Sequence, residues 1–422
     1  MILAEAFEIA FRPDGWVHFV VEGRSVTRGP VGVLLYLALV PAYWFVPRAH
    51  RSAYLIASSL LLALVTLGHA YTITLAALAL IGLAVVRGCG TPARRRLGAG
   101  LLVAWFTALL LYPQPPWLPQ ARETELLYFY LHWAGIGYLF LKTLHVLADV
   151  AAGRTPQPAA GDFLAYLLFA PTLRMGPIYR YGEFTRQLHG DPRRYRNPGT
   201  AALRLCTGLL RLGIMMALLE QFPLEQLFHE PQTLSAGELV VRIYLAPMTF
   251  YLWVSGYIDL TISVGRTMGF AVPENFNYPW RATDISDFWR RWHITLGDWL
   301  RDYIFIPLVR RRWHFAVAFI ATFLFIGIWH APWPCYLLWG LGQGIGLTVR
   351  RFWLQFWKRR RQGGSPLYQR LARARLVGSP VSIALSWLVT FHYEIATLTI
   401  GIDVHHAGRL IFRRVTDLLG LA

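Results

Sequence analysis

Residues 315–340 read FAVAFIATFLFIGIWHAPWPCYLLWG, and this stretch decides the fold class. From Phe315 to Gly327 almost every residue is apolar and none is charged, which is typical of a helix inside a membrane. The two prolines of segment 331–334 must end that helix, and a second apolar run starts at Cys335. We therefore expect two helices that form a hairpin.

His330 lies at the predicted bend of this hairpin, directly after Trp329. Arginines at 310–312 and 350–351 flank the hairpin and place both of its open ends on the same side of the membrane. At a rise of about 1.5 Å per residue, His330 is then roughly 20 Å or more from that side. An ionisable group at such depth usually marks function, and a buried structural histidine is the alternative.

The composition of the whole chain agrees with an integral membrane protein. Of its 422 residues, 55% are hydrophobic, 15% are charged and 17 are tryptophan. A membrane-spanning helix needs about 20 apolar residues, and the chain offers about ten or eleven such runs. They lie near 30–47, 53–69, 70–86, 98–112, 125–148, 162–178, 199–219, 238–269, 315–330, 335–349 and 378–400. We therefore predict an all-α, polytopic membrane protein whose shortest runs are re-entrant or tilted around a cavity.

No linker, repeat or low-complexity block divides the chain, so we expect one integral membrane domain over residues 1–422. The opening segment, MILAEAFEIAFRPDG, has no basic start, which argues against a cleaved signal peptide. The three cysteines, at positions 89, 206 and 335, follow no metal-binding spacing. Neither a metal site nor a disulfide framework is expected.

The formal net charge of +18 arises from 41 basic and 23 acidic residues. Most of the basic residues stand in the loops between apolar runs, and the positive-inside rule makes those loops cytoplasmic. Attraction to anionic lipid headgroups explains most of this charge, and part of it is available to an anionic substrate. The membrane spans exclude a nucleic-acid partner.

A second informative stretch, residues 284–303, reads DISDFWRRWHITLGDWLRDY. Its large apolar residues recur at steps of three and four, while charged residues fill the other faces. The pattern predicts an amphipathic helix within region 274–312, packed at the interface or re-entrant. His293 would face inward beside Trp289, either as a satisfied structural residue or as a catalytic one.

The chain resembles the membrane-bound O-acyltransferase family in five separate blocks. The first three are TFYLWVSGYID at 249–259, ENFNYP at 274–279 and DFWRRWHITLGDWLRDYIFIP at 287–307. The other two are IWH at 328–330, followed by LWG at 338–340, and FAPTLRMGPIYR at 169–180. The resemblance covers most of residues 130–350, which we take as the core motif region.

The resemblance implies a helix bundle around a central tunnel, entered from the cytoplasmic face and by a funnel from the other side. His330 matches the principal catalytic histidine of the family, and His293 matches its second motif histidine. Residues at other motif positions are expected to bind substrate or to shape the site: Ser255, Tyr257, Asp259, Asn275, Trp289, Arg290, Arg291, Trp292, Trp299, Arg301, Asp302, Tyr303 and Trp329. Two positions depart from the family pattern: Ala331 replaces a glycine, and Gln343 precedes Gly344 where a histidine is common.

The chemistry that the resemblance implies is acyl transfer from a thioester to a hydroxyl, which needs a base and a dry site rather than a bound cofactor. An imidazole with a pKa of about 6.5 suits the role of that base. We expect His330 to accept the hydroxyl proton and to return it to the leaving thiolate, without an acyl-enzyme. His293 would orient the donor or stabilise the oxyanion.

Two bacterial branches of the family resemble the chain about equally, those of alginate O-acetylation and of teichoic acid D-alanylation. Both imply a multi-pass protein of the bacterial inner membrane, with acyl-CoA or an acyl carrier protein as donor. Both also imply a cell-envelope acceptor and an extracytoplasmic hydrolase-like partner. A transporter or flippase without acyl transfer, and a scaffold with vestigial catalytic residues, remain the alternatives.

Overall fold

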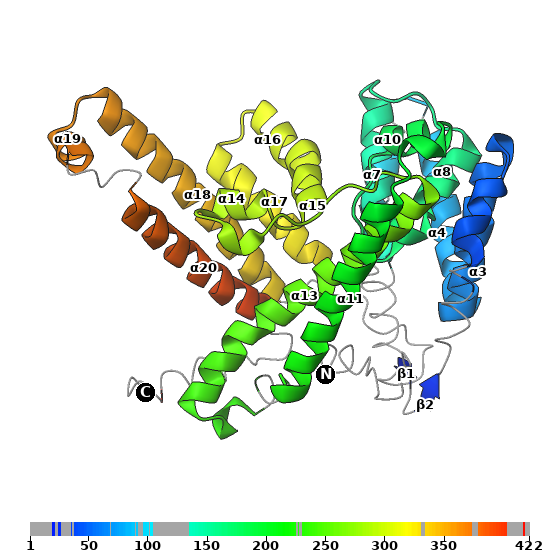
Figure 1. Cartoon of the computed structure of the whole chain (residues 1–422). Coiled ribbons are helices and arrows are strands. Elements are labelled where there is room, and N and C mark those ends of the chain that lie inside the picture. Colours follow the sequence, from blue (N-terminus) through cyan, green and yellow to red (C-terminus); the bar gives the residue numbers. More distant parts are fainter. Residues whose placement is uncertain are drawn as a thin grey trace, which may run out of the picture. The chain divides into compact units, whose positions relative to one another are not determined.

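The computed structural model describes residues 38–67, 69–88, 135–224, 230–330, 334–373 and 379–402. It also describes the short pieces 19–21, 24–26, 35, 90–91, 96–100, 102–103, 227 and 417. Within these ranges the elements are helices, apart from one hairpin of the strands β1 (Phe19–Val21) and β2 (Arg24–Val26), which pair antiparallel. The all-α prediction is confirmed (Figure 1).

Five helices in the described part of the chain are long and apolar enough to cross a membrane. They are α3 (Arg51–Leu67), α4 (His69–Gly88), α11 (Pro198–Gln221), α13 (Ala236–Met268) and α20 (Pro380–Ile402). Each coincides within a few residues with a predicted span. The predicted span 98–112 lies largely outside the described residues, and the spans 30–47 and 125–148 lie partly outside them, so the total of ten or eleven stays a prediction.

Two predicted spans differ from the structure. Residues 162–178 do not form one helix: α8 (Ala160–Leu167) and α9 (Ala170–Leu173) are followed by extended chain. The physical reason is local, because Pro171 lacks an N–H to continue α8 and Gly176 adopts a positive φ of 76°. The span predicted at 335–349 is instead part of a much longer helix, α18 (Pro334–Gln362).

The chain divides into two compact units that each combine distant segments. The first unit holds Met1–Ala217 and Leu252–Glu274, and the second holds Leu218–Tyr251 and Asn275–Ala422. The long helix α13 therefore supplies residues to both. Whether the two units act as the single predicted domain stays a prediction.

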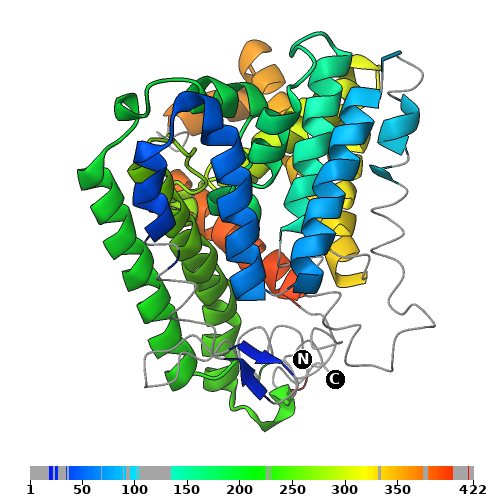
Figure 2. The same ribbon diagram turned by 90° about the vertical axis from the view of Figure 1, so that its right-hand side faces the viewer.

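In the first unit, α3, α4 and α7 (Ile136–Ala151) lie side by side, and α8 packs against them (Figure 2). The centre of this unit is aromatic and includes α10 (Tyr181–Leu188). Phe184 stacks on Phe270, with ring centroids 5.5 Å apart, and Phe169 contacts both rings. All three side chains are essentially inaccessible to solvent.

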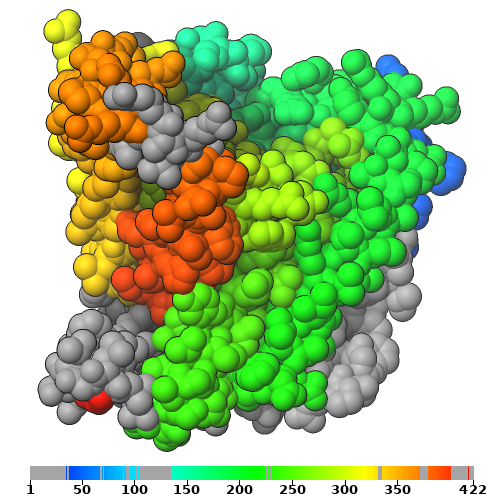
Figure 3. All heavy atoms as spheres, turned by 60° about the vertical axis from the view of Figure 1, so that its left-hand side comes forward, coloured from blue at the N-terminus to red at the C-terminus, as the bar shows by residue number. Residues whose placement is uncertain are grey.

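In the second unit, α17 (Phe315–His330) and α18 form an antiparallel hairpin, as predicted, and α20 packs along α18 (Figures 1 and 3). Three glycines allow the backbones of the hairpin to approach closely. An added Cβ atom at Gly327 would collide with the carbonyl of Tyr336, and one at Gly340 with the carbonyl of Phe323. At Gly344 it would collide with the backbone of Ile320. The bend at 331–333 lies outside the described residues.

We expect Gly340→Ala to destabilise this hairpin, because the added methyl group would collide with the backbone of α17. Overpacking of this kind typically lowers the free energy of unfolding by about 1–3 kcal/mol. The control is Gly342→Ala, where the new Cβ would only reach ordinary contact with the Thr397 methyl, at 3.5 Å. Thermal unfolding of the purified protein in detergent measures both. Equal melting temperatures for the two variants would contradict the prediction.

Candidate active site

The predicted amphipathic helix of region 274–312 is wrong as one continuous element. It is broken into η5 (Pro279–Arg281), α14 (Ile285–Trp289), α15 (Ile294–Leu300), a π-helix, η6 (Arg301–Phe305), and α16 (Ile306–Arg310). The break before α15 falls at His293, whose φ of 44° is left-handed. A left-handed backbone is strained for a residue other than glycine or asparagine, and such strain is concentrated at functional sites.

Asn275 holds the backbone that follows this break. Its Oδ1 accepts hydrogen bonds from the Thr295 N–H, at 3.0 Å, and from the Thr295 hydroxyl, at 2.8 Å. Its carbonyl accepts a further bond from the Ile294 N–H, at 2.9 Å. Asn275 is fully buried, and its Nδ2 has no hydrogen-bond partner among the residues that the structure describes. That amide is therefore a donor available beside His293.

His293 itself is buried against aromatic surface, with its ring 6.3 Å from that of Phe276. Burial disfavours the imidazolium and lowers the pKa of His293 to about 4. The side chain is therefore neutral at physiological pH.

The depressed pKa of His293 predicts a pH dependence of stability. In the unfolded chain the imidazole binds a proton below about pH 6.5, whereas in the folded chain it does so only below about pH 4. The free energy of unfolding should therefore fall as the pH drops between these values, by up to about 3 kcal/mol from this group. His293→Asn, which tolerates a left-handed backbone, should flatten that part of the melting-temperature profile. An unchanged profile would contradict the burial of a neutral imidazole.

His330 ends α17 and is half-buried. Its ring stacks on Tyr336, with centroids 5.6 Å apart and planes 19° apart, and meets the edge of Trp339 at 5.4 Å. The indole Nε1 of Trp339 is buried without a hydrogen-bond partner in the described part of the chain. A base and an N–H donor thus lie together on the hairpin.

A continuous path of contacting rings joins the two histidines within the second unit. Each neighbouring pair of rings along it has centroids between 5.2 and 6.3 Å apart. From His330 to His293 the rings are those of Trp339, Trp289, Phe288, Trp292 and Phe276. Two motifs distant in sequence are therefore parts of one aromatic cluster.

Comparison with known proteins identifies the family of the chain. The model of the membrane-bound O-acyltransferase family matches residues 100–370, more than half of the chain. The chain belongs to this family. It is 28% identical over 247 residues to a teichoic acid D-alanyltransferase of Streptococcus thermophilus, covering 53% of this chain and 58% of that protein.

Two further relatives come from other branches of the family. A probable alginate O-acetylase of Pseudomonas aeruginosa is 30% identical over 221 residues, which cover 51% of this chain and 42% of the relative. A peptidoglycan O-acetyltransferase of Helicobacter pylori is 30% identical over 238 residues, covering 55% and 42%. The aligned part of the chain thus spans about half the length of these family members.

The other family motif residues fall into separate groups. Trp289, Trp292 and Asn275 belong to the cluster around the histidines, and Trp329 is buried beside His330, with its ring at 4.9 Å. Tyr303 lies in the π-helix, its ring 5.3 Å from that of Trp299.

The motif arginines pair locally. Arg290, with 68% of its side chain exposed, and Arg291 both contact Asp287, at 3.4 and 2.9 Å. Arg301 pairs with Asp298 and Asp302 at the surface.

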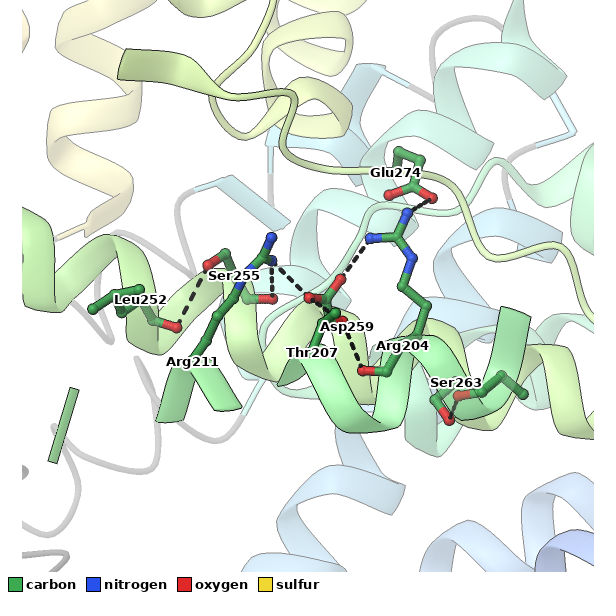
Figure 4. A network of polar contacts seen from close by, with 9 residues as sticks. Arg204, Thr207, Arg211, Leu252, Ser255, Asp259, Ser263 and Glu274 are labelled. Carbon is green, nitrogen blue, oxygen red and sulfur yellow. Dashed lines mark hydrogen bonds and ion pairs between the residues drawn. The ribbon is translucent and has the colours of Figure 1, made fainter. Parts of the chain in front are cut away.

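Asp259 belongs to the first unit, as do Ser255 and Tyr257. Its buried carboxylate accepts hydrogen bonds from Arg204, at 2.7 Å, and from Arg211, at 2.6 Å (Figure 4). Both arginines are on α11 and Asp259 is on α13, so the network ties these two membrane-length helices together. The substrate-binding role of Asp259 stays a prediction, and the contacts of its carboxylate are with side chains of α11.

Three polar residues of the cluster are absent from the predicted site. Gln343, fully buried on α18, accepts a hydrogen bond from the Trp289 indole at 2.8 Å. Its amide donates to Glu394 Oε2, at 3.0 Å, and to the Thr397 hydroxyl, at 2.8 Å. The sequence carried two signals for this network: the departure from the family pattern at Gln343, and an acidic residue inside the apolar run of α20.

Proposed function

We propose that the chain is a membrane O-acyltransferase that moves an acyl group, acetyl or D-alanyl, from a cytoplasmic thioester to a hydroxyl of a cell-envelope polymer or of a relay partner. The observation that carries the proposal is the ring path between His330 and His293 in a chain of this family. The relatives named above act on teichoic acid, alginate and peptidoglycan, all of which belong to the cell envelope or its surface.

In the proposed reaction, the acceptor oxygen forms a bond to the thioester carbonyl carbon and the carbon–sulfur bond breaks. His330 takes the hydroxyl proton and delivers it to the departing thiolate, so that the imidazole ends the cycle neutral. The Trp339 N–H, which has no partner in the described residues, is placed near His330 to stabilise the negative oxygen of the tetrahedral intermediate. His293, neutral and buried, would position the donor from the other end of the ring path.

The donor that we propose is acyl-CoA or an acyl carrier protein, reached from the cytoplasmic face of a bacterial inner membrane. The last turns of α18 support this, because Lys358 and the arginines at 359–361 are exposed there and both donors are anionic. The proposed extracytoplasmic partner is a hydrolase-like acyltransferase that receives the acyl group.

The test is acyl transfer by the purified protein in nanodiscs, supplied with radiolabelled acetyl-CoA or D-alanyl carrier protein and with candidate polymers. We expect label in the polymer or in the relay partner from one of the two donors. A protein that moves an envelope precursor across the bilayer but yields no acylated product with any donor would be a transporter, and the proposal would be wrong.

A further inference from the structure

The second unit contains an aromatic-walled cavity of about 160 Å³ next to the histidine cluster. It lies between the part of α13 within the second unit, the η5–α14 segment and α20. Its walls are almost entirely apolar and include the rings of Tyr244, Tyr251, Trp280, Phe288, Trp292 and Phe391. This volume is similar to that of protein cavities that bind benzene.

One acidic side chain, Glu394, lines this cavity from the middle of α20. The residue is only 4% exposed. Its Oε2 accepts the bond from Gln343, whereas its Oε1 is buried and has no hydrogen-bond partner in the described ranges. Leaving a carboxyl oxygen unsatisfied in apolar surroundings is costly, and such a group inside a membrane-length helix usually serves a ligand.

The chemistry of the cavity selects among possible ligands. A hydrocarbon chain would fit the walls but would leave Glu394 unsatisfied, and an anion would find no basic side chain among the lining residues. A metal ion needs several oxygen, nitrogen or sulfur ligands, and the described residues contain no group of three or more His, Cys, Asp or Glu side chains that could hold one. An ammonium group satisfies both features, because aromatic faces attract cations and a carboxylate supplies the counter-charge.

We propose that this cavity binds a small ammonium group, with Glu394 as its counter-ion and the aromatic residues as its cage. Phe288 and Trp292 belong both to the cavity wall and to the ring path between the histidines. Glu394 accepts a hydrogen bond from Gln343, which in turn accepts one from the indole of Trp289. The ring of Trp289 contacts that of Trp339, which lies beside His330. The ammonium comes either from an aminoacyl group such as D-alanyl or from the headgroup of an amine-bearing lipid.

Binding is tested without turnover, in nanodiscs of phosphatidylglycerol, through the fluorescence of the cavity tryptophans. The probes are D-alanine methyl ester, which carries an ammonium, and methyl propionate, which has nearly the same shape without it. We expect Glu394→Gln, which keeps the size of the side chain, to weaken binding of the amino ester at least tenfold and to leave methyl propionate unchanged. Equal affinity of wild type and Glu394→Gln for the amino ester would overturn the proposal.

Two further variants guard against indirect effects. Glu220→Gln removes the same charge at an exposed position outside the cavity and should bind as the wild type does. Trp280→Leu removes one wall of the cage, while the hydrogen bond from Trp387 to the backbone carbonyl of residue 280 can persist. It should weaken binding of the amino ester even if Glu394→Gln fails to fold. Wild-type affinity in Trp280→Leu would equally refute the cage.

The source of the ammonium is separated by competition. If replacing half of the phosphatidylglycerol by phosphatidylethanolamine displaces the amino ester, the site belongs to a lipid headgroup; if it does not, the site belongs to an aminoacyl group. The second assignment rests on the proposed function and predicts that Glu394→Gln lowers kcat/KM for D-alanyl thioesters much more than for acetyl thioesters. Absence of all transfer would defeat the proposed function alone, since ammonium binding is measured without it.

Discussion

Acyl transfer should fall by about 10²–10⁴ in His330→Ala, the range observed when a general base is removed. The reason is that the acceptor hydroxyl keeps its proton until the base takes it, and the described surroundings of His330 are aromatic. The loss should lie in kcat rather than in KM. The imidazole accepts the proton in the transition state, so its removal weakens an interaction that the bound substrate does not yet make. Initial rates with the labelled donor measure it.

The matched control for this variant is His50→Ala, which removes an exposed histidine outside the second unit. It should transfer acyl groups at the wild-type rate. The melting temperature of His330→Ala should stay close to that of the wild type, since the side chain is only half-buried. A folded His330→Ala protein that retains full activity would remove His330 from the mechanism.

The lengths of the apolar runs were enough to predict the membrane-length helices and the hairpin of residues 315–340. These features depend on local composition and on prolines, which a single sequence displays directly. The break at His293 was not predictable in this way, because the apolar spacing from Phe288 to Trp299 continues through it without change. The chain that follows the break is held by Asn275, about twenty residues away in sequence, whose Oδ1 accepts hydrogen bonds from the backbone N–H and the hydroxyl of Thr295.

The grouping of side chains was predictable only in part. The resemblance to the family named both histidines and the tryptophans between them, and the structure places these in one cluster. Asp259 stood among the same motif residues, yet its partners are arginines on α11. The pairing of Gln343 with Glu394 joins helices that the sequence gives no reason to place together.

Removing the carboxylate of Asp259 should be the most destabilising single change in the first unit. Asp259 is 2% exposed and neutralises two arginines, Arg204 and Arg211, on an adjacent membrane-length helix. Without it, Arg211 would lose this ion pair in a partly buried position, whereas Arg204 would keep its pair with Glu274, whose side chain is 49% exposed. Breaking a buried ion pair from one side typically lowers the free energy of unfolding by about 3–5 kcal/mol. We expect Asp259→Leu to give little folded protein, as measured by size-exclusion chromatography and thermal unfolding in detergent.

Two further variants separate the loss of pairing from a general intolerance to substitution. Asp298→Asn breaks an ion pair whose side chains are 45% and 55% exposed, and pairs of that kind contribute about 0–1 kcal/mol. Arg211→Met added to Asp259→Leu removes the arginine whose ion pair with Asp259 is lost and should recover part of the lost stability, because apolar groups can replace a buried ion pair. If the double variant is no more stable than Asp259→Leu, the carboxylate matters for a reason other than charge neutralisation.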